Sequence, residues 1–189
     1  MQADSRNLFH GILRELETCL GAIHPESLDR ALEEMSAAKR LFLAGCGRSG
    51  LAIRGFAMRL MHMGLNVHVV GETSTPAIHA DDCLVIGSGS GRTASLVAMA
   101  GKAREIGAKI VLFTIDPKSP IAQRADVVVV IPSPSPKAQT SAPAPNSIQP
   151  MGTLFEQSLY LTFDALVVAL MRERGVTSDQ MFARHANLE

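Results

Sequence analysis

Residues 41–50 read LFLAGCGRSG, an apolar run that passes directly into a glycine-rich loop. A short, continuous apolar run is typical of a strand that is buried on both faces of a parallel sheet. The next stretch, 49–64, carries apolar residues at helical spacing and ends at a glycine, the residue that most often caps a helix. These residues therefore predict a strand, a tight loop and a helix in succession, the start of an α/β fold.

The same alternation continues along the chain. Further apolar runs that we expect to be strands lie at 66–70, 83–86, 109–114 and 126–131. Stretches with helical spacing of apolar residues lie at 5–22, 25–38, 93–107 and 153–174. Strands that alternate with helices favour right-handed crossovers and a doubly wound, three-layer α/β/α sandwich. We expect one domain, divided into N-terminal helices 5–38, a sheet core 41–131, a Pro-rich loop 132–150, and a C-terminal helix and tail 152–189.

Composition and charge argue against several classes of protein. The 189 residues carry 18 Lys and Arg against 18 Asp and Glu and no Trp, so neither a basic surface nor aromatic stacking points to nucleic acid. The sequence predicts no signal peptide and no run of about 18 apolar residues that would span a membrane. The three cysteines and six histidines have no metal-ligand spacing. We expect a cytoplasmic protein with free thiols, no metal site, and no nucleic-acid or membrane partner.

A second glycine-rich loop, GSGSGRT at 87–93, follows the expected strand 83–86 and opens the next helix. The first amides of a helix have no internal partners, and the helix dipole places partial positive charge there. Glycines let the backbone approach an anion, and the hydroxyls of Ser88, Ser90 and Thr93 can donate to phosphate oxygens. One hydroxyl suffices to cap a helix, so three of them within six residues favour a phosphate site.

The first loop allows two interpretations. Its glycines match the dinucleotide fingerprint, and Glu72 stands 22 residues past Gly50, close to where a ribose-binding acid is expected. A dinucleotide fold, however, does not require a second Ser-rich loop on the third strand. Two hydroxyl-bearing loops instead favour a small phosphorylated polyol, with Ser49 facing a sugar hydroxyl, and the dinucleotide site is the alternative.

The Pro-rich stretch 132–150, PSPSPKAQTSAPAPNSIQP, holds most of the prolines and has no apolar periodicity. It is either a surface linker or a loop that shapes or covers a site. Its last part leads through Met151 and Gly152 into a helix, which favours the second interpretation for that part.

Together these motifs resemble the SIS, or sugar isomerase, domain. Beyond the two glycine loops, the chain is similar to the 6-phospho-3-hexuloisomerase family in RLMHMG at 59–64, VVGETSTPAI at 69–78, SIQPMGTLFEQ at 147–157 and RHANLE at 184–189. The resemblance covers nearly the whole chain. It implies a five-stranded parallel sheet of flavodoxin-like type, a sugar phosphate as ligand, no redox cofactor, and a homotetramer.

By this resemblance the reaction interconverts D-arabino-3-hexulose 6-phosphate and D-fructose 6-phosphate in the ribulose monophosphate pathway of formaldehyde fixation. A base removes the proton on carbon 2, a cis-enediolate forms, and a proton returns to carbon 3. The resemblance assigns the base to Glu156 and points to His62 as a proton-transfer partner. His185 is a third catalytic candidate, because in an oligomer the tail can reach a neighbouring site. The residue types alone also allow Glu156 to be a first-turn glutamate favoured by the helix dipole, and His62 a core or interface residue.

We expect substrate contacts from both glycine loops, namely from Gly47, Arg48, Ser49, Ser88, Gly89, Ser90, Gly91 and Thr93. Two other functions stay open beside the ketose–ketose isomerase. One is another phosphosugar isomerase that acts on an aldose, and the other is a non-catalytic SIS regulator that binds a sugar phosphate. Such regulators usually carry a DNA-binding domain, and the chain has no basic helix, so we expect an enzyme.

Overall fold

The computed structural model describes residues 5–134 and 147–188. Its centre is a five-stranded parallel sheet in the order β2-β1-β3-β4-β5, which is the flavodoxin-like order. The strands are β1 (Leu41–Gly45), β2 (Val67–Val69), β3 (Cys83–Gly87), β4 (Lys109–Thr114) and β5 (Val127–Val130). The predicted fold class is confirmed, and each predicted strand is correct to within one residue at either end.

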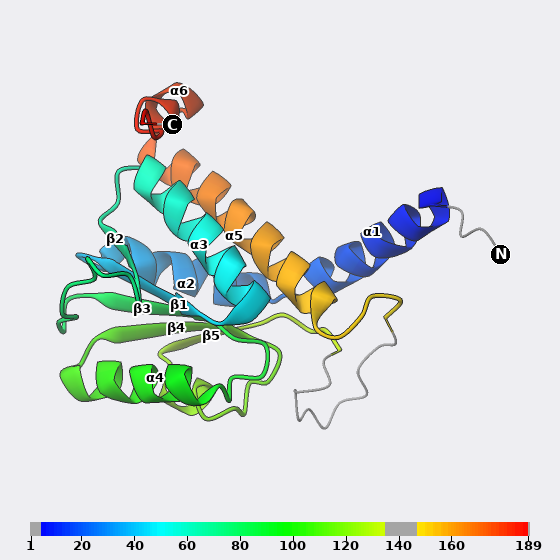
Figure 1. The fold of residues 1–189 in the computed structure, drawn as a ribbon, viewed down its shortest axis with the longest axis horizontal. Coiled ribbons are helices and arrows are strands. Elements are labelled where there is room, and N and C mark those ends of the chain that lie inside the picture. The colour runs from blue at the N-terminus through cyan, green and yellow to red at the C-terminus, as the bar shows by residue number, and fades with distance from the viewer. Residues whose placement is uncertain (1–4, 135–146, 189) are drawn as a thin grey trace.

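Helices cover both faces of the sheet, as Figure 1 shows. They are α1 (Ser5–Gly21), α2 (Pro25–Ala37), α3 (Gly47–His62), α4 (Ala94–Ile106), α5 (Thr153–Arg174) and α6 (Ser178–Phe182), with a 3-10 turn η1 (Ala122–Arg124). The green helix α4 covers one face, while α2, α3 and α5 lie on the other and α1 extends away from the body (Figure 1). This arrangement gives the three predicted layers.

Both faces are covered because alternate strand side chains point to opposite sides and both sets are apolar. On the α4 face, Leu96 packs with Ile86 and neighbouring strand residues in one apolar cluster. On the other face, Phe56 of α3 and Phe163 of α5 stack with ring centroids 4.3 Å apart, and Phe113 of β4 meets Phe163 edge-on at 4.9 Å. The long helix α5 is therefore fixed to both α3 and the sheet.

Helix α3 begins at Gly47, two residues earlier than predicted, so most of the first glycine loop is its first turn. Gly45 ends β1 and contacts Gly50 directly. A Cβ on Gly50 would lie 2.8 Å from the Gly45 carbonyl oxygen, which leaves no room for a side chain. This close approach seats the amino end of α3 directly on the end of β1.

Two features differ from the sequence prediction. Helix α5 is long and apolar enough to cross a membrane by length and composition alone, whereas we expected no such stretch. Half of that stretch is buried inside the protein, as in a core helix. The short helix α6 was not predicted, although its capping box is visible in the sequence: Thr177 accepts from the Gln180 amide, and the Gln180 side chain accepts from the Thr177 amide.

The predicted Pro-rich loop lies mostly outside the described residues, because 135–146 are not among them. Its last part, from Ser147 to Pro150, leads into α5 through Met151 and Gly152. Thr153 donates through both its amide and its hydroxyl to the Pro150 carbonyl, at 3.1 and 2.7 Å. The turn is therefore joined to the first residue of the helix.

Candidate active site

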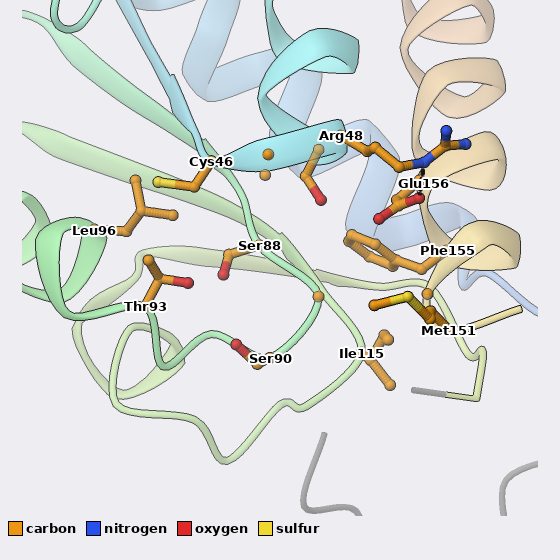
Figure 2. A pocket seen from close by; sticks show the side chains of 15 residues that line it. Cys46, Arg48, Ser88, Ser90, Thr93, Leu96, Ile115, Met151, Phe155 and Glu156 are labelled. Atoms are coloured by element: carbon orange, nitrogen blue, oxygen red, sulfur yellow. Dashed lines mark hydrogen bonds and ion pairs between the residues drawn. The ribbon is translucent and has the colours of Figure 1, made fainter. Parts of the chain in front are cut away.

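A cavity of about 310 Å³ lies where β1, β3 and β4 end. Ligands in open parallel sheets bind at this carboxyl edge, because the loops that follow the strands meet there. Figure 2 shows the Ser and Thr hydroxyls of the second loop on one side and Glu156 with Arg48 on the other. The residues around the cavity are Cys46, Gly47, Arg48, Ser49, Gly87, Ser88, Gly89, Ser90, Thr93, Leu96, Ile115, Met151, Gly152, Phe155 and Glu156.

Three helices begin at this cavity. The N-terminal caps of α3, α4 and α5 are Cys46, Thr93 and Gly152, and all three line it. Within the part of the chain that the structure describes, none of these caps has a side-chain hydrogen bond to its own helix. Apart from the Thr153 amide, which donates to the Pro150 carbonyl, the first amides of these helices are left for a ligand, and three helix dipoles place partial positive charge around one space. The arrangement is suited to an anion such as a phosphate.

The second glycine loop is held in shape from behind by the segment that follows β4. The Ile115 amide donates to the Gly89 carbonyl at 3.0 Å. Gly91 has a φ of 57°, and a Cβ there would lie 2.0 Å from the Ser119 hydroxyl oxygen. Only glycine fits this conformation and this space, so the shape of the loop depends on Gly91.

Arg92, in the same loop, is not a free cation because its guanidinium pairs with Asp116. Its Nη2 donates to Oδ2 of Asp116 at 2.8 Å, and the Asp116 side chain is only 3% exposed. Asp116 also accepts from the Lys118 amide at 2.9 Å. Arg92 therefore fastens the loop to its support instead of extending into the cavity.

Glu156 lies in the first turn of α5 and lines the cavity beside Phe155. Its carboxylate forms an ion pair with Nε of Arg48, which stands in the first turn of α3. The Glu156 side chain is 21% exposed and that of Arg48 is 62% exposed, so the arginine is the freer partner. The pair joins the amino ends of α3 and α5 at the mouth of the cavity (Figure 2).

The structure brings together most of the residues singled out from the sequence. Among the described residues, seven of the eight predicted substrate contacts line the cavity with Glu156, and Gly91 stands behind it as a structural residue. His62 and His185 lie elsewhere, at the far end of α3. Since a helix rises about 1.5 Å per residue, about 20 Å separate Ser49 from His62.

His62 and His185 are nevertheless close to each other. Their rings stack with centroids 5.4 Å apart, and His62 is only 3% exposed. Burial lowers the pKa of His62, and the neighbouring Arg59 and His185 lower it further. Arg59 lies 3.3 Å from Nδ1 of His62, and Arg184 donates to the His62 carbonyl at 3.1 Å. The tail thus packs its histidine onto a buried imidazole that is held neutral.

Several residues of the cavity were not predicted. Ile115 directly follows β4 at the carboxyl edge, a position that the strand boundaries alone would have identified. Cys46 is an exposed free thiol at the cap of α3. Met151 has a φ of 56°, unusual for a residue other than glycine, and no sequence signal marks it. Glu72, on which the dinucleotide alternative depended, instead forms an ion pair with Arg54.

Comparison with known proteins agrees with the geometry. Residues 34–161 match the SIS domain. The 3-hexulose-6-phosphate isomerase of Bacillus subtilis (strain 168) is 45% identical over 178 residues, which are 94% of this chain and 95% of that protein. The enzyme of the same name from Mycobacterium gastri is 42% identical over 175 residues, 93% and 86% of the two chains.

A solved structure leads to the same family. It is the crystal structure of a hypothetical protein from Methanococcus jannaschii that infers a molecular function of 3-hexulose-6-phosphate isomerase. It superposes with a TM-score of 0.84 at 29% identity and covers 97% of this chain and 99% of that one. The chain therefore belongs to the SIS domain family, in which its nearly full-length relatives include 3-hexulose-6-phosphate isomerases.

Proposed function

We propose that this protein acts as a single SIS domain and interconverts D-arabino-3-hexulose 6-phosphate and D-fructose 6-phosphate without a redox cofactor. Its named relatives indicate the broader reaction class, a sugar-phosphate isomerase. The observation that carries the finer proposal is one cavity with an anion-binding loop on the α4 side and a carboxylate on the α5 side.

The phosphate binds to the second glycine loop in this proposal. The hydroxyls of Ser88, Ser90 and Thr93 line the cavity next to the first amides of α4. Backbone amides, hydroxyls and the helix dipole act together on the same charge. Binding energy from the phosphate orients the distant reacting carbons, which is how a remote group contributes to catalysis.

Glu156 is the base that removes the proton from carbon 2 of the hexulose phosphate. The electron pair moves into the bond between carbons 2 and 3, and the carbon 3 carbonyl becomes the enediolate oxygen. The hydroxyl proton on oxygen 2 moves to oxygen 3, and Glu156 returns its proton to carbon 3, which gives fructose 6-phosphate. Because atoms and electrons balance within the substrate, no redox cofactor is needed.

Arg48 has two roles in this scheme. Without substrate, it pairs with Glu156 and keeps the carboxylate at the edge of the cavity. With substrate, the exposed guanidinium donates to the enediolate oxygens, where negative charge develops. The amino end of α3, on which Arg48 stands, adds to this stabilisation.

We propose that His62 and His185 act at the site of a neighbouring subunit in a homotetramer. They lie about 20 Å from the cavity end of their own α3, too far to reach the substrate bound there. Apolar side chains on α3 and α5 support assembly, since Leu51, Met58, Tyr160 and Val168 are 45–66% exposed. A neutral imidazole such as that of His62 is suited to moving the proton between the two enediolate oxygens.

The reaction belongs, on this proposal, to the ribulose monophosphate pathway of formaldehyde fixation in the cytoplasm. The test is a coupled assay in which a separate synthase makes the hexulose phosphate from formaldehyde and ribulose 5-phosphate. Fructose 6-phosphate is then followed through glucose 6-phosphate dehydrogenation. We expect turnover by the wild-type protein. No turnover, together with a rise in Tm on adding fructose 6-phosphate, would point to a binding protein or another phosphosugar substrate.

A further inference from the structure

Helix α1 contacts the turn that precedes the catalytic helix through one carboxylate. Glu15 accepts three hydrogen bonds from the turn: from the Ser147 hydroxyl at 2.7 Å, the Ile148 amide at 2.7 Å and the Gln149 side-chain amide at 2.9 Å. The Ser147 oxygen in turn accepts from the Gln149 amide at 3.0 Å. Three consecutive residues of the turn are thus bound to one side chain that lies more than 130 residues earlier in the sequence.

The charge of Glu15 suits this role. Burial acts to raise the pKa of its carboxyl, but the hydrogen bonds from Gln149, Ile148 and Ser147 outweigh burial and lower it. A carboxylate accepts through both oxygens, and hydrogen bonds to a charged acceptor are stronger than those between neutral groups. A neutral side chain of the same shape cannot accept all three.

Packing strengthens the same contact. The side chain of Ile148 lies so close to α1 that a Cβ on Gly11 would be 2.6 Å from its Cδ1 atom. Gly11 and Glu15 are four residues apart on α1 and therefore face the same side. One face of α1 thus binds both the backbone and a side chain of the turn.

The turn also determines where the cavity wall lies. Two residues after Gln149, Met151 adopts its unusual left-handed conformation, and Met151 and Gly152 both line the cavity. The Glu156 amide donates to the Gly152 carbonyl at 3.0 Å in the first turn of α5. A shift of the turn would therefore move the wall and the first turn that carries Glu156.

We propose that Glu15 is a positioning residue of the active site, which holds the turn 147–150 so that Met151 and Glu156 stand correctly against the phosphate loop. Glu15 does not touch substrate and acts only through the turn. The kinetic test of this proposal rests on the proposed function. A second test, by hydrogen exchange, does not depend on that function. The phosphate loop (residues 87–93, between β3 and α4) makes none of the hydrogen bonds to Glu15, so we expect its affinity for phosphate to change little in Glu15 variants.

The first experiment compares Glu15→Gln with Glu17→Gln, an exposed glutamate on the same helix. A misplacement of about 1 Å can cost up to about 100-fold in rate, so we expect Glu15→Gln to lower kcat about tenfold. KM should stay within about twofold because the phosphate anchor is intact. Glu17→Gln should match the wild type. A Glu15→Gln protein with wild-type kcat, or one whose KM alone changes, would overturn the proposal.

A compensating variant separates positioning from general loss of stability. In Glu15→Gln with Gln149→Glu, the donor and acceptor of that pair are exchanged and the total charge is kept. We expect kcat of the double variant to return to within about threefold of the wild-type value. Neither single variant should reach that value, so the recovery would show that the two residues are coupled. If both single variants and the double variant are equally slow, Glu15 does not act through this contact. Should Glu15→Gln fail to fold, Ser147→Ala removes one of the three bonds and should lower kcat severalfold.

Hydrogen exchange tests the contact without any assay of turnover. Amides of Ile148, Gln149, Met151 and Gly152 should exchange severalfold faster in Glu15→Gln than in the wild type, while amides of the phosphate loop keep their rate. If the wild type shows no isomerase activity but this difference is found, the proposed function fails and the positioning role stands. Equal exchange in both proteins would overturn the positioning role whatever the activity.

Discussion

At its amino end, α3 meets the amino ends of α4 and α5 around a cavity that Arg48 and Glu156 border. At its carboxyl end, about 20 Å away, the same helix buries His62 beneath His185 of the tail. The first end combines the amino ends of three helices and a carboxylate within one chain. The second end gathers titratable groups far from that cavity. The difference supports the proposal that one subunit supplies the phosphate anchor and the base, and that the histidines act at the site of a neighbouring subunit.

The largest effect should come from removing the proposed base, Glu156, at the amino end of α5. Glu156→Gln keeps the shape of the side chain and abolishes proton abstraction, so we expect kcat to fall about 10³-fold. Its ion pair with the exposed Arg48 should contribute less than about 1 kcal/mol to the free energy of unfolding. Steady-state kinetics and a thermal melt measure both quantities. Glu173→Gln, on the exposed last turn of the same helix, is the control, and near-wild-type turnover in Glu156→Gln would remove it as the base.

Co-expression of two variants tests whether Glu156 of one subunit and His62 of its neighbour form one shared site. Glu156→Gln and His62→Gln should each be nearly inactive alone. If the site is shared between two subunits, co-expression of the two variants should restore about a quarter of the wild-type activity, because half of the pairs are hybrid and each has one intact site. Hybrid assemblies that stay inactive would confine His62 to a structural role.

A smaller effect should follow from disturbing the phosphate loop. Gly91→Ala places a Cβ in a left-handed conformation against Ser119, so we expect strain of about 1–3 kcal/mol and a KM about tenfold higher. Gly101→Ala, in the interior of α4 with open space around it, should instead stabilise the protein by up to about 1 kcal/mol. Urea unfolding and substrate titration distinguish the two. An unchanged KM in Gly91→Ala would mean that the loop does not hold the phosphate.

The smallest effect concerns pH at the far end of α3. Because the folded protein lowers the pKa of His62, the unfolded chain binds more protons below about pH 6.5. The stabilisation from a neutral His62 is thus complete above that pH and is lost as the pH falls through the lower, folded value. Between pH 7.5 and 5, His62→Gln should therefore lose less stability than the wild type in urea unfolding. His10→Gln, at an exposed position, is the control, and equal slopes for His62→Gln and wild type would contradict this reading.

Much of the fold could be predicted because its signals are local. Each buried strand is a continuous apolar run, and Gly107, the last residue of the stretch 93–107 that was predicted to be helical, ends α4 in the left-handed conformation. The two glycine loops could be assigned to one cavity because helix ends and hydroxyls are visible in a few consecutive residues. Met151 could not be found this way, since its conformation follows from the turn before it rather than from its own residue type.

Contacts between distant segments could not be predicted from the sequence pattern. His62 and His185 are 123 residues apart, and only the folded tail brings their rings together. Glu15 lies on a helix that the pattern described only as amphipathic, and its partners follow the Pro-rich stretch. In the same way, Arg92 stands in the second glycine loop, but its partner Asp116 lies 24 residues later. In each case the partner depends on the path of the chain and not on local spacing.

The most direct test of the central claim is to incubate the protein to equilibrium with fructose 6-phosphate in D2O and locate the deuterium by NMR. If Glu156 removes and returns the proton of a cis-enediolate between carbons 2 and 3, deuterium should enter at carbon 3, and Glu156→Gln should show almost none. Deuterium at carbon 1 would contradict the account and identify an aldose–ketose isomerase. No deuterium at any carbon, with fructose 6-phosphate bound, would mean that the cavity binds a sugar phosphate without catalysing its isomerisation.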